Sequence, residues 1–595
     1  MIRDFLASGH RYQAPAVVVL DRAVERIFSD GGRASLTHTI TQVLSKEGIE
    51  RAAEVAVPSG AEVLALRTRK TDGTIREAQE IAGKPTVSAT DVSVGDFVEW
   101  ETLEYKQPAE AFAPGFLGER FYFQSFEAPL DRSEYLLVVP SEMSVDQDRR
   151  AGAPEPALEP SPDGTRVWRF VARQMPQLFP ERSSFSAEAW IPSVRVSSGV
   201  DLARWSRFLA DRLYTVARIS PEVRRVAAQI RAETVAARAT IPEAIVHWVN
   251  QHIEPEAGLF EPATVSLSRG QGNRAAVVVA LARALGKKAE FMLLRPLTRA
   301  AAAAPATPQE LDDFSEALVR LTDPAGGAQF FDPRTRRVPL GYLPPALAGA
   351  TGFAVGDDAL ATARGAVPDG RRVIMKVRLS ADGSASASVT EALSGWPALE
   401  WGEIVERTGQ DRIKLRQEFE QRWLSQQFPG SVLGELSVGE GPAGSKLVRY
   451  TLTSPRMGTR TGNILWLRPG FFLAQPGRRY FTEPQRRTPL QLGYDVPLLL
   501  EADIELPAGS QVLDLGSSGS ITAGGALFSE ERQVQIDGPH GDAPRAAHLL
   551  LRRRWQLPLS CVLPADYDEM ASNLRQVDPL EQGEIRVELP PATGK

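Results

Sequence analysis

The chain has 595 residues, of which 43% are hydrophobic and 24% are charged, and its formal net charge is −6. This length exceeds what one hydrophobic core can organise, so it predicts several domains. The charges are spread without long runs, which argues against a dedicated nucleic-acid-binding surface. No apolar run approaches the length of a transmembrane helix. The single cysteine, Cys561, excludes an intrachain disulfide.

The first 215 residues are predicted to form an antiparallel β domain. Val17–Leu20 and Val24–Phe28 are rich in apolar residues, and Ser29–Gly32 supplies the turn that follows them. Further strands are expected at Val98–Tyr105, Phe121–Phe126, Tyr135–Val139 and Val167–Ala172. Short strands separated by turn signals are typical of two packed antiparallel sheets.

Helices and a small antiparallel sheet are predicted next. Thr240–Glu243 is a capping-box sequence with a proline in the first helical turn. An apolar helix is expected at Ala275–Leu285, stopped by Gly286, and upstream of it Thr264–Leu267 is the only candidate strand. The other segments expected here are the helices Asp201–Val216 and Pro221–Ala237, the strands Glu290–Leu294, Val319–Leu321 and Gln329–Phe331, and a low-complexity insertion at Ala301–Ala304.

The remainder of the chain returns to a β pattern. Strands are expected at Arg372–Leu379, Ala385–Thr390, Val496–Leu506 and Ala547–Pro558. Asp411–Gln427, rich in Arg, Glu and Gln, is expected to be a helical interruption, and Tyr567–Val577 a short helix. No internal repeat is visible in the sequence.

Three short motifs in the middle region point to one family. Ser268–Arg274 contains a Gly-x-Gly turn before the apolar helix, Phe330–Pro333 is an aromatic-x-Asp-Pro segment, and Pro339–Pro344 has the pattern Pro-x-Gly-x-Leu-Pro. This region resembles the core of the transglutaminase-like (papain-like cysteine) superfamily. The resemblance implies an α+β multidomain fold with an N-terminal antiparallel β domain (1–215), a degenerate transglutaminase-like core (216–365) and a C-terminal antiparallel β domain (366–595).

The resemblance also locates the family's triad positions. In the family a cysteine begins the buried helix, where unpaired N–H groups and the helix dipole lower the thiol pKa. That position is Gly272 here, Glu316 stands where the histidine base belongs, and only Asp332 matches its motif. A glutamate cannot repeat the role of histidine toward sulfur, so no catalytic residue is assigned and the triad is degenerate.

Other candidate sites are not expected to be functional. Gly270–Ala275 matches a loose dinucleotide-binding fingerprint, but no βαβ unit is predicted around it. His247 and His252 are five residues apart, which places them on different helix faces, and the chain has no Cys pair, so these histidines are not expected to bind a metal. No cofactor is expected. Cys561 lies in an apolar run and is expected to be a small buried hydrophobe.

The function expected from the resemblance is a non-catalytic pseudo-transglutaminase that binds a peptide or protein or serves as a scaffold. Helix N–H groups at the degenerate turn would receive an acidic group, with Glu316 as a possible internal occupant. The binding residues of this hypothesis are Arg269, Gly272, Asn273 and Arg274.

Two alternatives are a hydrolase that uses Glu316 and Asp332 as paired carboxylates, and a purely structural spacer. In the leading hypothesis Asp332 is structural and bridges to Arg334 or Arg274. The start, Met1–Leu6, does not have the pattern of a signal peptide, whereas relatives of this architecture are often exported, so the resemblance implies an extracytoplasmic address. A protein or peptide partner is expected, with no nucleic acid and no membrane span.

Overall fold

The computed structural model describes residues 1–78, 86–161, 163–237, 239–299, 308–322, 327–409, 411–536 and 547–591. The expected insertion at Ala301–Ala304 lies outside these residues. The chain divides into two compact units, Met1–Arg212 with Ala303–Ser315 and Phe353–Ala359, and Leu213–Ala302 with Glu316–Gly352 and Leu360–Lys595. The protein is therefore multidomain and sheet-rich, while the three-part boundaries expected from the sequence stay a prediction.

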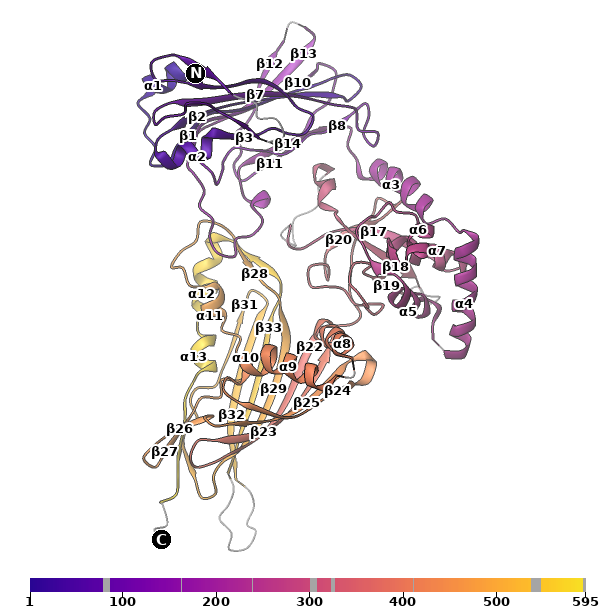
Figure 1. The fold of residues 1–595 in the computed structure, drawn as a ribbon, viewed down its shortest axis with the longest axis vertical. Helices are drawn as coiled ribbons and strands as arrows, with labels where there is room; N and C mark the ends of the chain where they lie inside the picture. Colours follow the sequence, from indigo (N-terminus) through magenta and orange to yellow (C-terminus); the bar gives the residue numbers. More distant parts are fainter. Residues whose placement is uncertain are drawn as a thin grey trace. The chain divides into compact units, whose positions relative to one another are not determined.

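Two packed sheets make up most of the first unit (Figure 1). The larger sheet has the order β12-β13-β10-β1-β2-β7-β4-β5 and the smaller one β11-β14-β8, with β9 also paired to β14. Between the sheets lies a cluster of buried residues that includes Ile27, Tyr135, Phe170 and Val194. The bounds are α1 Ile2–Ser8, β1 Ala16–Ile27, β2 Arg33–Val43, α2 Lys46–Ala53, β3 Glu54–Ala56, β4 Glu62–Arg69, β5 Ile75–Glu77, β6 Thr86–Ser88, β7 Phe97–Lys106, β8 Phe116–Leu117, β9 Phe121–Tyr122, β10 Leu130–Pro140, β11 Asp146–Arg150, β12 Ala157–Pro160, β13 Thr165–Met175 and β14 Ser193–Ser198.

The middle region places the helix α7 at the centre of a small α/β layer. Residues Arg274 to Ala282 of α7 are all buried, which is typical of a helix that is apolar on every side. The helix packs on α4, α5, α6, β17 and β18. The bounds are α3 Leu202–Val216, α4 Pro221–Ala237, α5 Ile241–His252, β15 Glu254–Pro255, α6 Ala263–Arg269, β16 Gln271–Gly272, α7 Arg274–Ala284, β17 Ala289–Arg295, η2 Pro308–Asp313, β18 Glu316–Thr322, β19 Ala328–Phe331, β20 Thr351–Ala354 and β21 Leu360–Thr362.

Local signals in this region were predicted with mixed success. The capping box at α5 is confirmed, because the Thr240 side chain accepts from the Glu243 N–H and the Glu243 carboxylate accepts in return. The strand expected at Thr264–Leu267 is wrong, since these residues form α6. The core helix begins at Arg274, one residue before the expected start, because Asn273 caps it. None of the helices that the structure describes is long and apolar enough to cross a membrane.

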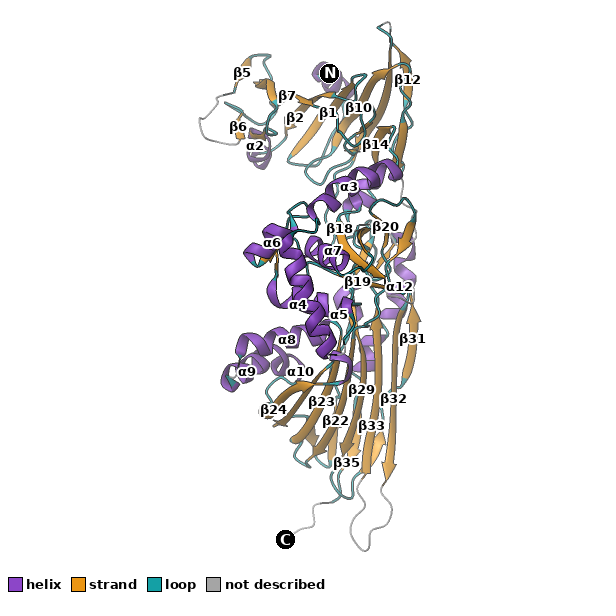
Figure 2. Ribbon diagram, turned by 90° about the vertical axis from the view of Figure 1, so that its right-hand side faces the viewer, coloured by secondary structure: helices purple, strands orange, loops and turns teal. Residues whose placement is uncertain are grey.

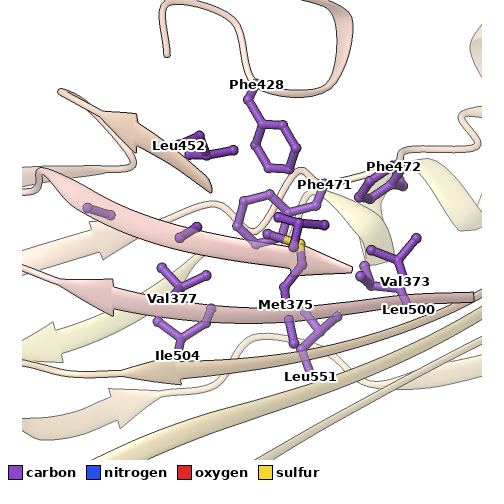
Figure 3. Close-up of a cluster of buried hydrophobic side chains, with 14 of the residues drawn as sticks. Val373, Met375, Val377, Phe428, Leu452, Phe471, Phe472, Leu500, Ile504 and Leu551 are labelled. Carbon is purple, nitrogen blue, oxygen red and sulfur yellow. The ribbon is translucent and has the colours of Figure 1, made fainter. Parts of the chain in front are cut away.

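The C-terminal region holds a second pair of packed sheets, and Figure 2 shows the long strands of the larger one side by side. Their orders are β24-β25-β23-β22-β29-β33-β32-β31 and β26-β27-β35-β30. Figure 3 shows Val373, Met375 and Val377 of β22 in the core between them, close to Phe428 and Phe471. The bounds are β22 Gly370–Leu379, β23 Ala385–Ser394, α8 Trp396–Thr408, α9 Arg412–Phe419, the π-helix Glu420–Leu424, α10 Ser425–Gln427, β24 Val432–Glu440, β25 Lys446–Ser454, β26 Gly458–Thr461, β27 Ile464–Leu467, α11 Pro476–Tyr480, β28 Leu490–Leu492, β29 Asp495–Glu505, β30 Gln511–Asp514, β31 Gly519–Ala523, β32 Ala526–Ile536, β33 Ala547–Leu557, β34 Ser560–Val562, α12 Tyr567–Leu574, α13 Val577–Glu581 and β35 Ile585–Glu588.

The two sandwiches share one strand topology. Six antiparallel strand pairs of the first sandwich each have a counterpart in the second, with equivalent partners and the same direction. Taken in order, they are β1–β2, β2–β7, β4–β7, β10–β13, β12–β13 and β11–β14 in the first, and β22–β23, β23–β25, β24–β25, β29–β33, β32–β33 and β30–β35 in the second. In each large sheet one central pair, β1–β10 or β22–β29, is parallel. The expectation of purely antiparallel domains is wrong at these two pairs. β10 runs in the same direction as its neighbour β1, and β29 in the same direction as its neighbour β22, so each large sheet is mixed.

Candidate functional site

The site expected at Gly272 is filled by another side chain of the same region. Gly272 has a φ of +132°, and a Cβ built on it would lie 2.1 Å from Glu261 Oε1 and 2.7 Å from Ser266 Oγ. Real side chains do not approach so closely, so any larger residue at this position requires Glu261 to move. The space into which a side chain at residue 272 would project is therefore occupied by the Glu261 carboxylate.

Hydrogen bonds hold Glu261 in that place. Ser266 Oγ donates to Glu261 Oε1 over 2.7 Å and itself accepts from the backbone N–H of Asn273 over 2.9 Å. Arg269 Nη1 donates to Glu261 Oε2 over 2.9 Å, and Arg269 also pairs with Glu256 at 2.9 Å. The hydroxyl of Ser266 thus connects the carboxylate to the N-terminus of α7.

Asn273 ties the same loop to the start of the helix. Its Oδ1 accepts from the Ala276 N–H over 3.1 Å as the N-cap, and its Nδ2 donates to the carbonyls of Leu259 and Glu261 over 2.6 and 3.1 Å. The sequence hypothesis named Glu316 as the internal acid of this turn. The structure places Glu261 there instead.

Arg274 lies in the interior and does not face the Gly272 turn with its guanidinium. The residue is 1% exposed, and its Nη1 donates to the carbonyls of Pro333 and Thr335 over 3.2 and 2.8 Å. Its Nη2 donates to Asn250, and the guanidinium lies 5.0 Å from the centre of the Phe331 ring. Burial lowers the pKa of Arg274 to about 10. This side chain joins α7 to the segment after β19, so its expected role as an anion ligand beside Gly272 does not fit the geometry.

Glu316 and Asp332 are brought together by Arg334. Asp332 is 1% exposed, and its Oδ1 accepts from the backbone N–H and the Nε of Arg334 over 3.0 and 3.2 Å. Its Oδ2 accepts from Thr335 Oγ1 over 2.8 Å, and Glu316 pairs with Nη1 of Arg334. Burial raises the pKa of Asp332, while the hydrogen bonds from Arg334 and Thr335 oppose that rise. The expected bridge from Asp332 to Arg334 is present.

Other candidate residues lie in ordinary structural positions. Cys561 is half-buried on β34, where it pairs with Gln491 of β28, and burial raises the pKa of its thiol, which disfavours the reactive thiolate. His252 stacks on Trp248 with ring centres 4.3 Å apart. Within the described ranges no group of three or more His, Cys, Asp or Glu could hold a metal ion. The Gly270 turn follows a helix and not the long strand of a dinucleotide-binding unit.

Sequence reasoning did not find Glu261. The residue belongs to the irregular segment between β15 and α6, and nothing in its local pattern marks it as a partner of Gly272, eleven positions later. The one available signal was a pair of opposite charges, Glu261 and Arg269, at the two ends of the segment that forms α6.

Comparison with known proteins finds a likeness in fold to a solved structure. No family model matches the chain, and the search of curated proteins finds no significant match. Among solved structures, the chain is similar to a protein from Parabacteroides distasonis described as a "putative protease", with a TM-score of 0.59 and 12% sequence identity over 97% of this chain and 99% of that one. At this identity the likeness concerns the fold alone.

Proposed function

We propose that the chain is a non-catalytic relative of the transglutaminase-like superfamily that binds a peptide or protein partner or serves as a scaffold. The observation that carries this proposal is the Glu261 carboxylate held where a nucleophile's side chain would project from residue 272. With Gly272 at the helix start, the site lacks the atom that attacks a substrate carbonyl in this family.

The second support is the state of the two remaining positions. A general base needs a free lone pair near the proton that it removes. Glu316 is engaged by Arg334, and Asp332 accepts three hydrogen bonds from Arg334 and Thr335. An alternative hydrolase with these two carboxylates as acid and base would have to displace the Arg334 guanidinium, which is bound to both of them.

The binding half of the proposal is tested with a peptide library. A displayed library of random twelve-residue peptides is selected on the immobilised full chain, and the enriched peptides are resynthesised for calorimetry. The proposal expects enrichment of related sequences with micromolar or better affinity, as in other peptide-recognition modules. Repeated selections that enrich nothing above the bare support would contradict it and favour the spacer.

The catalytic half is tested separately by turnover. If the chain binds selected peptides and also cleaves them, the peptide-binding half of the proposal holds and the non-catalytic half is wrong. The two results are independent, so the failure of one half is visible without the other.

A further inference from the structure

The large C-terminal sheet has one face that is turned away from the core. Along β22, β29 and β33 the residues alternate between buried and more exposed positions, so every second side chain lies on the open face. The register pairs Arg372 with Leu499 and Leu499 with Arg554. An Arg-Leu-Arg row therefore crosses the three neighbouring central strands, which Figure 2 shows side by side.

A hollow of about 430 Å³ lies over this row. Its aliphatic lining includes Ala392, Pro497, Leu499 and Leu527. Its polar lining includes Arg372, Arg554, Ser394 and Gln556. This volume falls within the range of small-ligand sites, and the mixture of an apolar wall with a few polar groups is typical of them.

The two arginines of the row differ in their partners. Arg372 Nη2 lies 2.9 Å from Glu501 Oε2, so its charge is neutralised within the sheet. Arg554 makes no ion pair or side-chain hydrogen bond with any residue that the structure describes. Its neighbours in register, Leu499 and Ser529, carry no charge that could neutralise it. The hollow thus holds an exposed guanidinium that has no ion-pair partner among the described residues and lies beside aliphatic side chains.

We propose that this hollow binds the C-terminal carboxylate of a polypeptide whose last residues are apolar. A guanidinium receives a carboxylate in a forked, charge-assisted geometry, so Arg554 fits the terminal group. Leu499 and Leu527 supply the wall for the aliphatic side chain that the carboxylate carries.

Two polar groups favour a polypeptide over a fatty acid as the occupant. The hydroxyl of Ser394 and the amide of Gln556 line the same hollow, and neither forms a side-chain hydrogen bond within the described ranges. They can pair with the N–H and C=O groups of a peptide backbone, which an alkyl chain does not offer. This site is separate from the Gly272 region, so the inference does not depend on the proposed function.

Calorimetry on the full chain tests the inference with N-acetyl-leucyl-leucine, its C-terminal amide and decanoate. The acid is expected to bind, with the amide weaker by about tenfold or more because it lacks the charge that Arg554 receives. Arg554→Gln should weaken the acid by a similar factor and leave the amide unchanged. Arg449→Gln, which removes an exposed arginine of β25 outside the hollow, is the matched control and should change neither affinity.

Three results would overturn the inference. Equal affinity for acid and amide would show that the hollow does not recognise the carboxylate. An unchanged affinity in Arg554→Gln would show that Arg554 does not bind the ligand. Binding of decanoate without binding of the dipeptide would assign the hollow to a fatty acid and contradict the polypeptide. Equal melting temperatures of both variants and the parent chain ensure that a lost affinity reflects the site.

Discussion

The Glu261 carboxylate and the α-carbon of Gly272 are so close that no side chain fits between them: a Cβ on Gly272 would lie 2.1 Å from Glu261 Oε1. Three neighbouring side chains hold Glu261 in this position: Ser266 Oγ and Arg269 Nη1 donate to its carboxylate, and the Asn273 amide Nδ2 donates to its backbone carbonyl. The turn before α7 is thus filled by an acid from the same region of the chain.

Gly272→Ala should lower the free energy of unfolding by about 2–4 kcal/mol, because the new methyl group collides with Glu261 and the backbone φ of +132° disfavours any L-residue. Gly258→Ala is the matched control, since Gly258 has a similar φ, +146°, but a Cβ built there lies 3.7 Å from its nearest neighbour, Glu261 Cβ, which is an ordinary contact. That control lacks the collision and should therefore cost less than Gly272→Ala by about 1 kcal/mol or more. Urea unfolding measures both, and equal losses would show that no collision occurs at residue 272.

An engineered thiol should reveal the same obstruction. Two variants are compared in a Cys561→Ser background: Gly272→Cys alone, and Gly272→Cys combined with Glu261→Ala. Iodoacetamide should alkylate the first about tenfold more slowly, because the Glu261 carboxylate both blocks the thiol and disfavours the thiolate. Circular dichroism checks that each variant is folded. Equal rates would mean that Glu261 does not occupy this place in solution.

A buried ionic cluster is expected to stabilise the C-terminal sandwich. Arg553 and Glu530 have fully buried side chains, with Arg553 Nη2 2.6 Å from Glu530 Oε2. Arg553→Met should lower stability by about 3–5 kcal/mol, because it leaves a buried charge without one of its partners. Arg552→Met, on the exposed face of the same strand, should change stability by less than about 1 kcal/mol. Urea midpoints that fall equally in the two variants would contradict the ranking.

Asp21 should make the first sandwich less stable as pH rises. Burial raises its pKa from 3.8 to about 6, and Ser133 Oγ donates to its Oδ2 over 2.8 Å. The folded state therefore holds this proton more tightly than the unfolded state. Its stabilising effect is complete below about pH 4 and is lost as pH rises through about 6.

Asp21→Asn keeps the acceptor for Ser133 and removes the ionisation. At pH 7 it should therefore increase the protection of β1 and β10 backbone amides against hydrogen exchange by about 1–3 kcal/mol, and at pH 4 it should have little effect. Hydrogen exchange followed by mass spectrometry measures this locally. Protection that is independent of pH in the parent chain would show that Asp21 ionises as it does in an unfolded chain.

Local patterns predicted the features that are formed by neighbouring residues. The Thr240–Glu243 capping box is confirmed because its donors and acceptors lie three residues apart. The helix around Asp411–Gln427 is confirmed in the same way, since the Asp411 side chain caps α9. In contrast, Thr264–Leu267 is apolar at alternate positions, yet it forms a helix that packs on α7.

Relationships between distant residues could not be predicted from such patterns. The parallel pairing of β1 with β10 brings Arg22 within 2.7 Å of Glu134, 112 positions away, and neither residue carries a local mark of that pairing. The shared topology of the two sandwiches is invisible for the same reason, because it resides in strand order and not in recurring residues. Glu261 was missed because only the folded loop brings it to Gly272.

The central claim, that the core does not catalyse, is tested most directly by turnover of the parent chain. Amine incorporation, amide hydrolysis and peptide cleavage are measured beside the variants Glu316→Gln and Cys561→Ala. We predict rates indistinguishable from buffer in all three proteins. Turnover by the parent chain that either substitution abolishes would contradict the account.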